Sequence, residues 1–249
     1  MKKEYIKYLL SEVSKQVSFD EESHTYHYGN KKLISTTQFL GQFKPEFESV
    51  KIATKSSSIK TSKYYNIPVN DILQEWEDVK EIACMKGTLI HKAAEFISLG
   101  LDDKIKVPEE FNSYIEQLIQ FFTEINPDII APEVILFNSE LLLGGMIDLI
   151  TFNKDGTIDI YDWKTNKELK KSNRYTKTYS TPINHILDTS IEGYSLQLTV
   201  YKKMLEYHKF KVRDMFIVHI TPDNYTVIKC KDYSTEINEL FEVRKKQIS

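Results

Sequence analysis

The sequence predicts an α/β protein in which a central mixed sheet is flanked by helices, with a small N-terminal lobe. The chain has 249 residues, 41% of them hydrophobic and 28% charged, which is enough for one domain with a substantial core. After residue 70 the expected elements begin with helices, continue with three strands, and end with a helix, two strands and a helix, an order that suits a sheet between helical layers. We expect residues 1–70 to form the lobe and residues 71–249 the core.

The lobe should contain a hairpin, a short helix and a loop. Apolar and polar residues alternate over Val17–Ile34 around Gly29, which is typical of a β-hairpin. A short helix can follow over Thr36–Phe43. The stretch KIATKSSSIKTSKYYNIP, which begins at Lys51, has little apolar periodicity, so we expect it to be a mobile basic surface loop.

Three helices are expected before the strands. Asp71 can cap a helix that Gly87 interrupts or ends. Thr88 can cap a second helix, which carries His91 and stops at Gly100. A third amphipathic helix is expected over residues 109–125.

The second half of the chain supplies most of the sheet. The runs PEVILFN, ELLLGGMIDLITF and TIDIYDWKT are separated by turn residues, which predicts a meander of three antiparallel strands. Residues 166–191 lack sustained periodicity and are long for a connector. A helix over residues 192–208, strands over 214–221 and 225–231, and a helix that Ser234 caps complete the chain.

Composition narrows the possible functions. The formal net charge is −3 and the pI about 6.1, so nucleic-acid binding would have to depend on local basic patches. Cys84 and Cys230 are far apart in sequence, which gives no support to a disulfide framework or a cysteine-rich metal site. The N-terminus has no apolar run of the length that a signal peptide or membrane span needs. We therefore expect a cytoplasmic protein with no membrane partner.

The stretch GGMIDLITFNKDGTIDIYDWKTNK places charges where a sheet would normally bury apolar residues. Alternate side chains of a strand share a face, so Asp162 and Lys164 are neighbours on one side. Folding the hairpin about residues 153–156 can bring Asp148 alongside Asp162. Close carboxylates persist in the ionised form when a hard divalent cation such as Mg²⁺ or Mn²⁺ neutralises them, and the lysine suits an anionic substrate such as a phosphate. A salt-bridged edge hairpin is the structural alternative.

Several stretches, in the order found here, resemble motifs of the PD-(D/E)XK nuclease superfamily, and of its RecB-like exonuclease branch in particular. They are KGTLIHKAAE, PEVIL, GGMID with IYDWKT, and YSLQLTVYKKMLE, and together they cover about half of the chain. Ile147 stands where the name-giving pattern has proline. The segments around His24–Thr37 and TPINHILDT resemble phage-encoded members more loosely, so a phage protein in the host cytoplasm is one interpretation. The resemblance implies a restriction-endonuclease-like core over residues 71–249.

The resemblance also implies roles for individual residues. Asp148 and Asp162, the backbone carbonyl of Trp163 and the imidazole of His91 would bind the metal, and Lys164 would orient the attacking water and stabilise charge on the phosphate. Glu133 would be a further carboxylate of the site, although it could instead simply open a strand. Gln197 and Tyr201, four residues apart on one helix face, would bind a phosphate or position the lysine. The imidazole would shift metal preference toward Mn²⁺.

A basic segment follows the hairpin and is the candidate DNA-binding surface. Basic side chains bind phosphates and an exposed tyrosine can stack on unpaired bases, although a solvated charged loop would have the same composition. The candidate contacts are Lys167, Lys170, Lys171, Arg174, Tyr175 and Lys177, with Tyr179 as a second stacking residue.

These features predict a metal-dependent deoxyribonuclease that acts on DNA ends as an exonuclease, in recombination or repair and with a recombination or replication protein as its partner. Three alternatives remain at this point. The chain could be a structure-specific endonuclease of the same superfamily, a nonenzymatic nucleic-acid-binding accessory protein of recombination, or a protein that holds another phosphorylated substrate.

Overall fold

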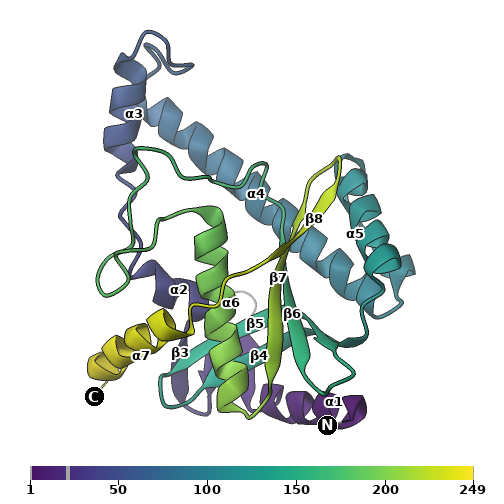
Figure 1. Ribbon diagram of the computed structural model, residues 1–249. Coiled ribbons are helices and arrows are strands. Elements are labelled where there is room, and N and C mark those ends of the chain that lie inside the picture. Colours follow the sequence, from purple (N-terminus) through teal and green to yellow (C-terminus); the bar gives the residue numbers. More distant parts are fainter. Residues whose placement is uncertain (1, 21–22, 249) are drawn as a thin grey trace.

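The structure is a computed structural model in which residues 2–20 and 23–248 are described (Figure 1). Its elements alternate between helices and strands, with two single 3-10 turns at Asp102–Lys104 and Glu109–Phe111. In chain order the elements are α1 (Lys3–Ser14), β1 (Val17–Asp20), β2 (Thr25–Tyr28), β3 (Lys31–Ser35), α2 (Thr36–Gly41), α3 (Ser49–Ser58), α4 (Val69–Ser98), α5 (Asn112–Ile125), β4 (Ile129–Asn138), β5 (Leu143–Phe152), β6 (Ile158–Lys164), α6 (Ser190–Tyr207), β7 (Val212–Ile220), β8 (Tyr225–Lys229) and α7 (Ser234–Ile248).

The eight strands form one mixed sheet, which confirms the expected fold class. The path runs β1-β2-β3-β5-β6-β7-β8, and β4 pairs with β5 off this path. Strands β4, β5 and β6 form the expected antiparallel meander, while β3 pairs with β5 and β6 pairs with β7 in parallel. Because β4 covers one edge of β5 along nearly its whole length, β3 and β6 must share the other edge.

This shared edge of β5 is open in its middle. Strand β3 pairs only with Leu143 and Gly144, whereas β6 pairs with the residues from Leu149 to Phe152. The intervening residues 145–148 have no paired strand on that side. The sheet therefore splits at a place where the backbone and side chains of β5 can face a ligand.

Two apolar clusters cover the faces of the sheet, as the alternation of β6 predicts. Ile158 and Ile160 pack in the larger cluster with helices α1, α2, α6 and α7. Tyr161 and Trp163 point to the other face and pack with α4 and α5 around Phe121. Figure 1 shows α6 on one side of the sheet and α4 and α5 on the other.

The structure differs from the sequence expectations in three helices, of which α1 was not expected at all. Residues 51–68 were expected to be a mobile loop, but Ser49–Ser58 form α3, because Ala53 is fully buried and tertiary contacts outweigh weak local propensity. Gly87 neither ends nor interrupts a helix, since α4, which is 30 residues long, continues through this position. A glycine inside a helix costs about 1 kcal/mol relative to alanine, which the packing of Ile90, Ala93 and Ala94 can offset.

The segment between β6 and α6 has two different halves. Residues 165–177 are largely exposed, in keeping with the expected surface segment. Tyr179, Ile183 and Ile186 are instead buried in the larger core cluster, so Tyr179 is not available to stack on a base and that expectation was wrong.

The first 70 residues join the same sheet and core as the rest. Tyr26 and Leu33 pack in the larger cluster together with β5 and α6, and β3 pairs with β5. The division at residue 70 therefore stays a prediction. Within the described residues, no helix has the length and apolar character needed to cross a membrane.

Candidate active site

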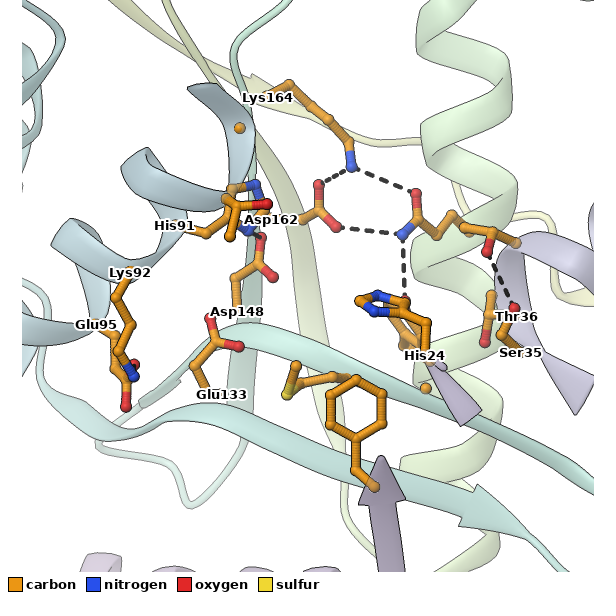
Figure 2. Close-up of a pocket in the computed structure, with 18 of the residues that line it drawn as sticks. His24, Ser35, Thr36, His91, Lys92, Glu95, Glu133, Asp148, Asp162 and Lys164 are labelled. Atoms are coloured by element: carbon orange, nitrogen blue, oxygen red, sulfur yellow. Dashed lines mark hydrogen bonds and ion pairs between the residues drawn. The ribbon is translucent and has the colours of Figure 1, made fainter. Parts of the chain in front are cut away.

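A cleft of about 700 Å³ lies over the open edge of β5. One wall is formed by α4, β4, β5 and β6 and carries the ionisable side chains that the sequence singled out. The other wall is formed by the N-terminal strands and the start of α2. Figure 2 shows His91, Glu133, Asp148, Asp162 and Lys164 gathered on the first wall.

Three potential metal ligands converge from three different elements. His91 comes from α4, Glu133 from β4 and Asp148 from β5, and each offers one ligand atom within 4.8 Å of the others. Glu133 lies opposite Asp148 because the flanking pairs are Pro132 with Leu149 and Val134 with Ile147. Antiparallel pairing thus places the two carboxylates on the same face of the sheet.

His91 bridges two of the expected ligand groups. Its Nδ1 lies 3.4 Å from Asp148 Oδ2, and its Nε2 lies 3.1 Å from the carbonyl oxygen of Trp163. Burial alone would lower the pKa of His91, but the charges of Asp148 and Asp162 outweigh it and raise the pKa to about 9. In the metal-free protein a protonated imidazole therefore donates to the Trp163 carbonyl and forms an ion pair with Asp148.

The two carboxylates of this cluster have opposite pKa shifts. Burial raises the pKa of Asp148, but His91, Lys164 and the Trp163 N–H, which donates to Asp148 Oδ2 at 2.8 Å, outweigh this and lower it. Burial and the nearby charge of Asp148 raise the pKa of Glu133 to about 8. Glu133 also has a φ of 48°, a left-handed conformation that costs about 1 to 2 kcal/mol in a residue other than glycine.

Asp162 and Lys164 form a second group beside the first. Lys164 Nζ lies 2.5 Å from Asp162 Oδ2; the Asp162 side chain is almost completely buried and the Lys164 side chain is partly buried. Gln197 on α6 accepts from Lys164 at 3.5 Å and donates to Asp162 at 3.4 Å and to the Tyr201 hydroxyl at 3.2 Å. Burial alone would lower the pKa of Lys164, but Asp162 and Asp148 raise it, so the ammonium stays charged.

Gly145 explains how closely Tyr201 approaches β5. A Cβ at this position would lie 2.6 Å from Tyr201 Cε1 and 2.9 Å from Thr36 Oγ1. Real Cβ atoms do not approach other atoms this closely, so the absence of a side chain is what allows α6 to bring Gln197 and Tyr201 to the site.

The structure thus brings together nearly all the expected site residues, but in two groups. Asp162 is not part of the three-residue cluster, because its carboxylate faces Lys164 and Gln197. The roles of these residues stay predictions. The six expected DNA contacts, Lys167, Lys170, Lys171, Arg174, Tyr175 and Lys177, are all exposed on the segment that leaves β6.

Sequence reasoning assigned no role to the residues of the second wall or to Lys86. Lys86 donates to the carbonyl of Thr165 at 2.8 Å and to the Tyr114 hydroxyl at 3.1 Å, which fixes the chain just after Lys164. The residues around Lys86 in the sequence gave no indication of these two contacts. The second wall depends on the pairing of β3 with β5, which brings together residues that are about 110 positions apart in the chain.

The donor set fits a divalent cation. Glu133 Oε1 is buried and has no hydrogen-bond partner among the described residues, which is costly unless the oxygen binds something. Two carboxylates and an imidazole suit Mg²⁺ or Mn²⁺, and the nitrogen ligand favours Mn²⁺.

Two similar solved structures are distant. A crystal structure from Eubacterium rectale, of a protein described as a candidate exonuclease, aligns over 66% of this chain and 66% of its own, with 17% identity and a TM-score of 0.44. The chain thus spans just under two thirds of that protein. The structure of the protein SSO0001 aligns over 97% of this chain and 85% of its own, with 13% identity and a TM-score of 0.36.

No curated protein sequence matches the chain significantly. The family comparison is more informative, because the sequence profile of the PD-(D/E)XK nuclease superfamily matches residues 121–247, just over half of the chain. This range includes Asp148, Asp162 and Lys164. The chain belongs to the PD-(D/E)XK nuclease superfamily.

Proposed function

We propose that this chain is a divalent-metal-dependent deoxyribonuclease of the RecB-like branch that degrades DNA from its ends. The observation that carries the proposal is the convergence of His91, Glu133 and Asp148 beside the Asp162–Lys164 ion pair in one cleft. Structural salt bridges account for an isolated pair. They do not account for a third carboxylate whose buried oxygen has no partner.

The side chains have different roles in phosphodiester hydrolysis. His91, Glu133 and Asp148 would hold Mg²⁺ or Mn²⁺, with Asp162 and the Trp163 carbonyl as further oxygen donors beside them. When bound, the metal lowers the pKa of a water molecule and stabilises negative charge on the phosphate.

Lys164 supplies a fixed positive charge for the same reaction. Its ammonium is held by Asp162 and Gln197 at the cleft, so it needs little reorganisation when negative charge grows on the phosphate oxygens. Tyr201 supports Gln197 from the same helix by accepting its hydrogen bond.

DNA is the substrate that the surface charge favours. The exposed residues 167–177 carry five basic side chains and one acidic side chain, in a protein whose net charge is −3. They begin three residues after Lys164, so a strand bound there leads toward the cleft. The second wall borders the cleft on one side, which favours a strand end over an uninterrupted duplex as the substrate. A role in recombination or repair is part of the same proposal.

The test is cleavage of end-labelled linear DNA and of closed circular DNA in Mg²⁺, in Mn²⁺ and in EDTA. We expect linear DNA to be shortened in either metal, circles to stay intact, and EDTA to abolish cleavage. Nicked circles would instead identify an endonuclease, and an absence of cleavage in both metals would contradict the nuclease proposal.

Two variants test the assigned chemistry. Asp148→Asn keeps an oxygen that can accept the Trp163 N–H but loses the charge, and Lys164→Ala removes the ammonium. Each should reduce cleavage at least 100-fold, since charge stabilisation of this kind contributes about 3 kcal/mol. Lys154→Ala, in the exposed turn of the same hairpin, is the matched control and should cleave like the parent.

A further inference from the structure

The second wall of the cleft has a composition that contrasts with the first. Its lining residues are Phe19, His24, Tyr26, Ser35, Thr36 and Thr37. The four carboxylates that line the cleft all belong to the first wall. A phosphate-bearing ligand therefore meets metal ligands on one side and aromatic rings and hydroxyl groups on the other, where none of the described lining residues is acidic.

Strand β3 sets the distance between the walls. Ser35 pairs with Gly144, which lies four residues before Asp148 on β5. At about 3.3 Å per residue, the two positions are about 13 Å apart along the strand. Figure 2 shows His24, Ser35 and Thr36 across the cleft from Glu133 and Asp148. This separation leaves room for a nucleotide beside a phosphate at the metal ligands.

Two hydroxyl groups of this wall are hydrogen-bonded to each other. The N–H of Gln38 donates to Ser35 Oγ at 3.1 Å, and Ser35 Oγ lies 3.1 Å from Thr37 Oγ1, where either hydroxyl can be the donor. When Ser35 donates to Thr37, the proton of the exposed Thr37 hydroxyl is free for an acceptor such as a phosphate oxygen.

The aromatic residues form a platform next to these hydroxyls. The Phe19 ring stacks on Tyr26 with centroids 4.6 Å apart, and His24 meets it edge-on at 5.2 Å. His24 has a φ of 53°, in the left-handed region that histidine adopts more often than most residues. Stacking on such a platform is how proteins hold unpaired bases regardless of sequence.

We propose that this wall is a nucleotide-binding subsite that holds the deoxynucleotide next to the scissile phosphate. Phe19 and His24 stack on its base, and the Thr37 hydroxyl donates to its phosphate. The inference rests on the proposed nuclease function and adds a substrate-binding role for Phe19, His24 and Thr37, which lie outside the range that the family profile matches.

The test measures binding of a single-stranded oligonucleotide in EDTA, with 2-aminopurine placed in turn at each position near one end. Thr37→Val keeps the shape of the side chain but removes the donor, and should weaken binding about tenfold. The salt dependence of binding should not change, because a neutral hydroxyl displaces no counterion. Thr123→Val, on an exposed face of α5, is the matched control and should bind like the parent.

Phe19 is tested through the fluorescence of the base. In the parent protein, 2-aminopurine should be quenched at one position near the end of the strand. Phe19→Leu should abolish the quenching, whereas Phe19→Tyr, which keeps an aromatic ring, should retain it. This difference separates a loss of stacking from a loss of folding.

The outcomes separate this inference from the proposed function. If the parent cleaves DNA and the Thr37 and Phe19 variants bind, quench and cleave like Thr123→Val, the subsite is refuted while the nuclease proposal stands. If the parent neither binds nor cleaves DNA, both are refuted.

Discussion

Binding of a divalent cation should expel protons from the site, and the number can be worked out from the structure. In the metal-free protein, His91 has a pKa of about 9 and donates toward Asp148 and the Trp163 carbonyl, and Glu133 has a pKa of about 8. Both must lose their protons to bind a metal. The perturbation is therefore the addition of Mn²⁺ to the metal-free protein.

The expected release depends on pH. At pH 7.5 a group with a pKa of about 9 is about 97% protonated and one with a pKa of about 8 about 76% protonated, so about 1.7 protons should leave per ion. The logarithm of the apparent affinity should then rise by about 1.7 per pH unit near pH 7.5. At pH 10 both groups are largely deprotonated, and the release should fall to about 0.1 proton by the same relation.

Isothermal titration calorimetry in two buffers with different enthalpies of ionisation measures this number directly. A His91→Gln variant should release about one proton fewer, whereas His185→Gln, outside the cleft, should release as many as the parent. Release of less than about half a proton at pH 7.5, or a release that does not change between pH 7.5 and pH 10, would show that the assigned protonation of the cluster is wrong.

Three further predictions concern stability. Glu133→Gln should raise the free energy of unfolding of the metal-free protein, measured with urea in EDTA, by on the order of 4 kcal/mol at pH 9 and by under about 1 kcal/mol at pH 5. Because the pKa of Glu133 is raised from 4.5 to about 8 in the folded protein, the free energy of unfolding decreases as the pH rises from 4.5 to 8, and the loss is complete above pH 8. Gly145→Ala should cost about 1 to 3 kcal/mol, because its Cβ would collide with Tyr201, whereas Gly41→Ala, with open space around it in α2, should be neutral or stabilising in the same assay. Mn²⁺ at 100 times its Kd should add about 2.7 kcal/mol and raise Tm by about 5 to 10 °C at pH 8, and an unchanged Tm in differential scanning fluorimetry would mean that the folded protein binds no ion.

Strand alternation made the charged hairpin predictable from sequence. Apolar and charged residues alternate along β6, and the turn at residues 153–156 fixes the register that pairs Leu149 with Tyr161. From these two features alone, Asp148 and Asp162 must lie on neighbouring strands and on one face. The antiparallel meander is a local structure, and a local pattern is sufficient to predict it.

Contacts between distant segments made other features unpredictable. Residues 51–68 have little apolar periodicity, and α3 forms because Ala53 packs against the rest of the protein. The same limit applies to the pairing of Ser35 with Gly144, since two residue pairs in a parallel register leave no trace in the sequence. The second wall of the cleft, and the position of Glu133 opposite Asp148 with a positive φ, follow only from the assembled sheet.

The charge of the cluster explains why a sheet can carry these residues where its core should be. Without a metal, the raised pKa values leave His91 protonated and Glu133 neutral near pH 7. Burial also raises the pKa of Asp162, which Lys164 opposes; with Asp162 ionised in its pair with Lys164, the charges of His91 and Lys164 cancel those of Asp148 and Asp162. With His91 neutral and Glu133 ionised, three carboxylates and one ammonium leave a net charge of minus two. One divalent ion cancels that charge, whereas a monovalent ion would leave a buried charge uncompensated. The same desolvated residues are therefore electrically balanced in both states, and the exchange of two protons for one divalent cation is what converts one state into the other.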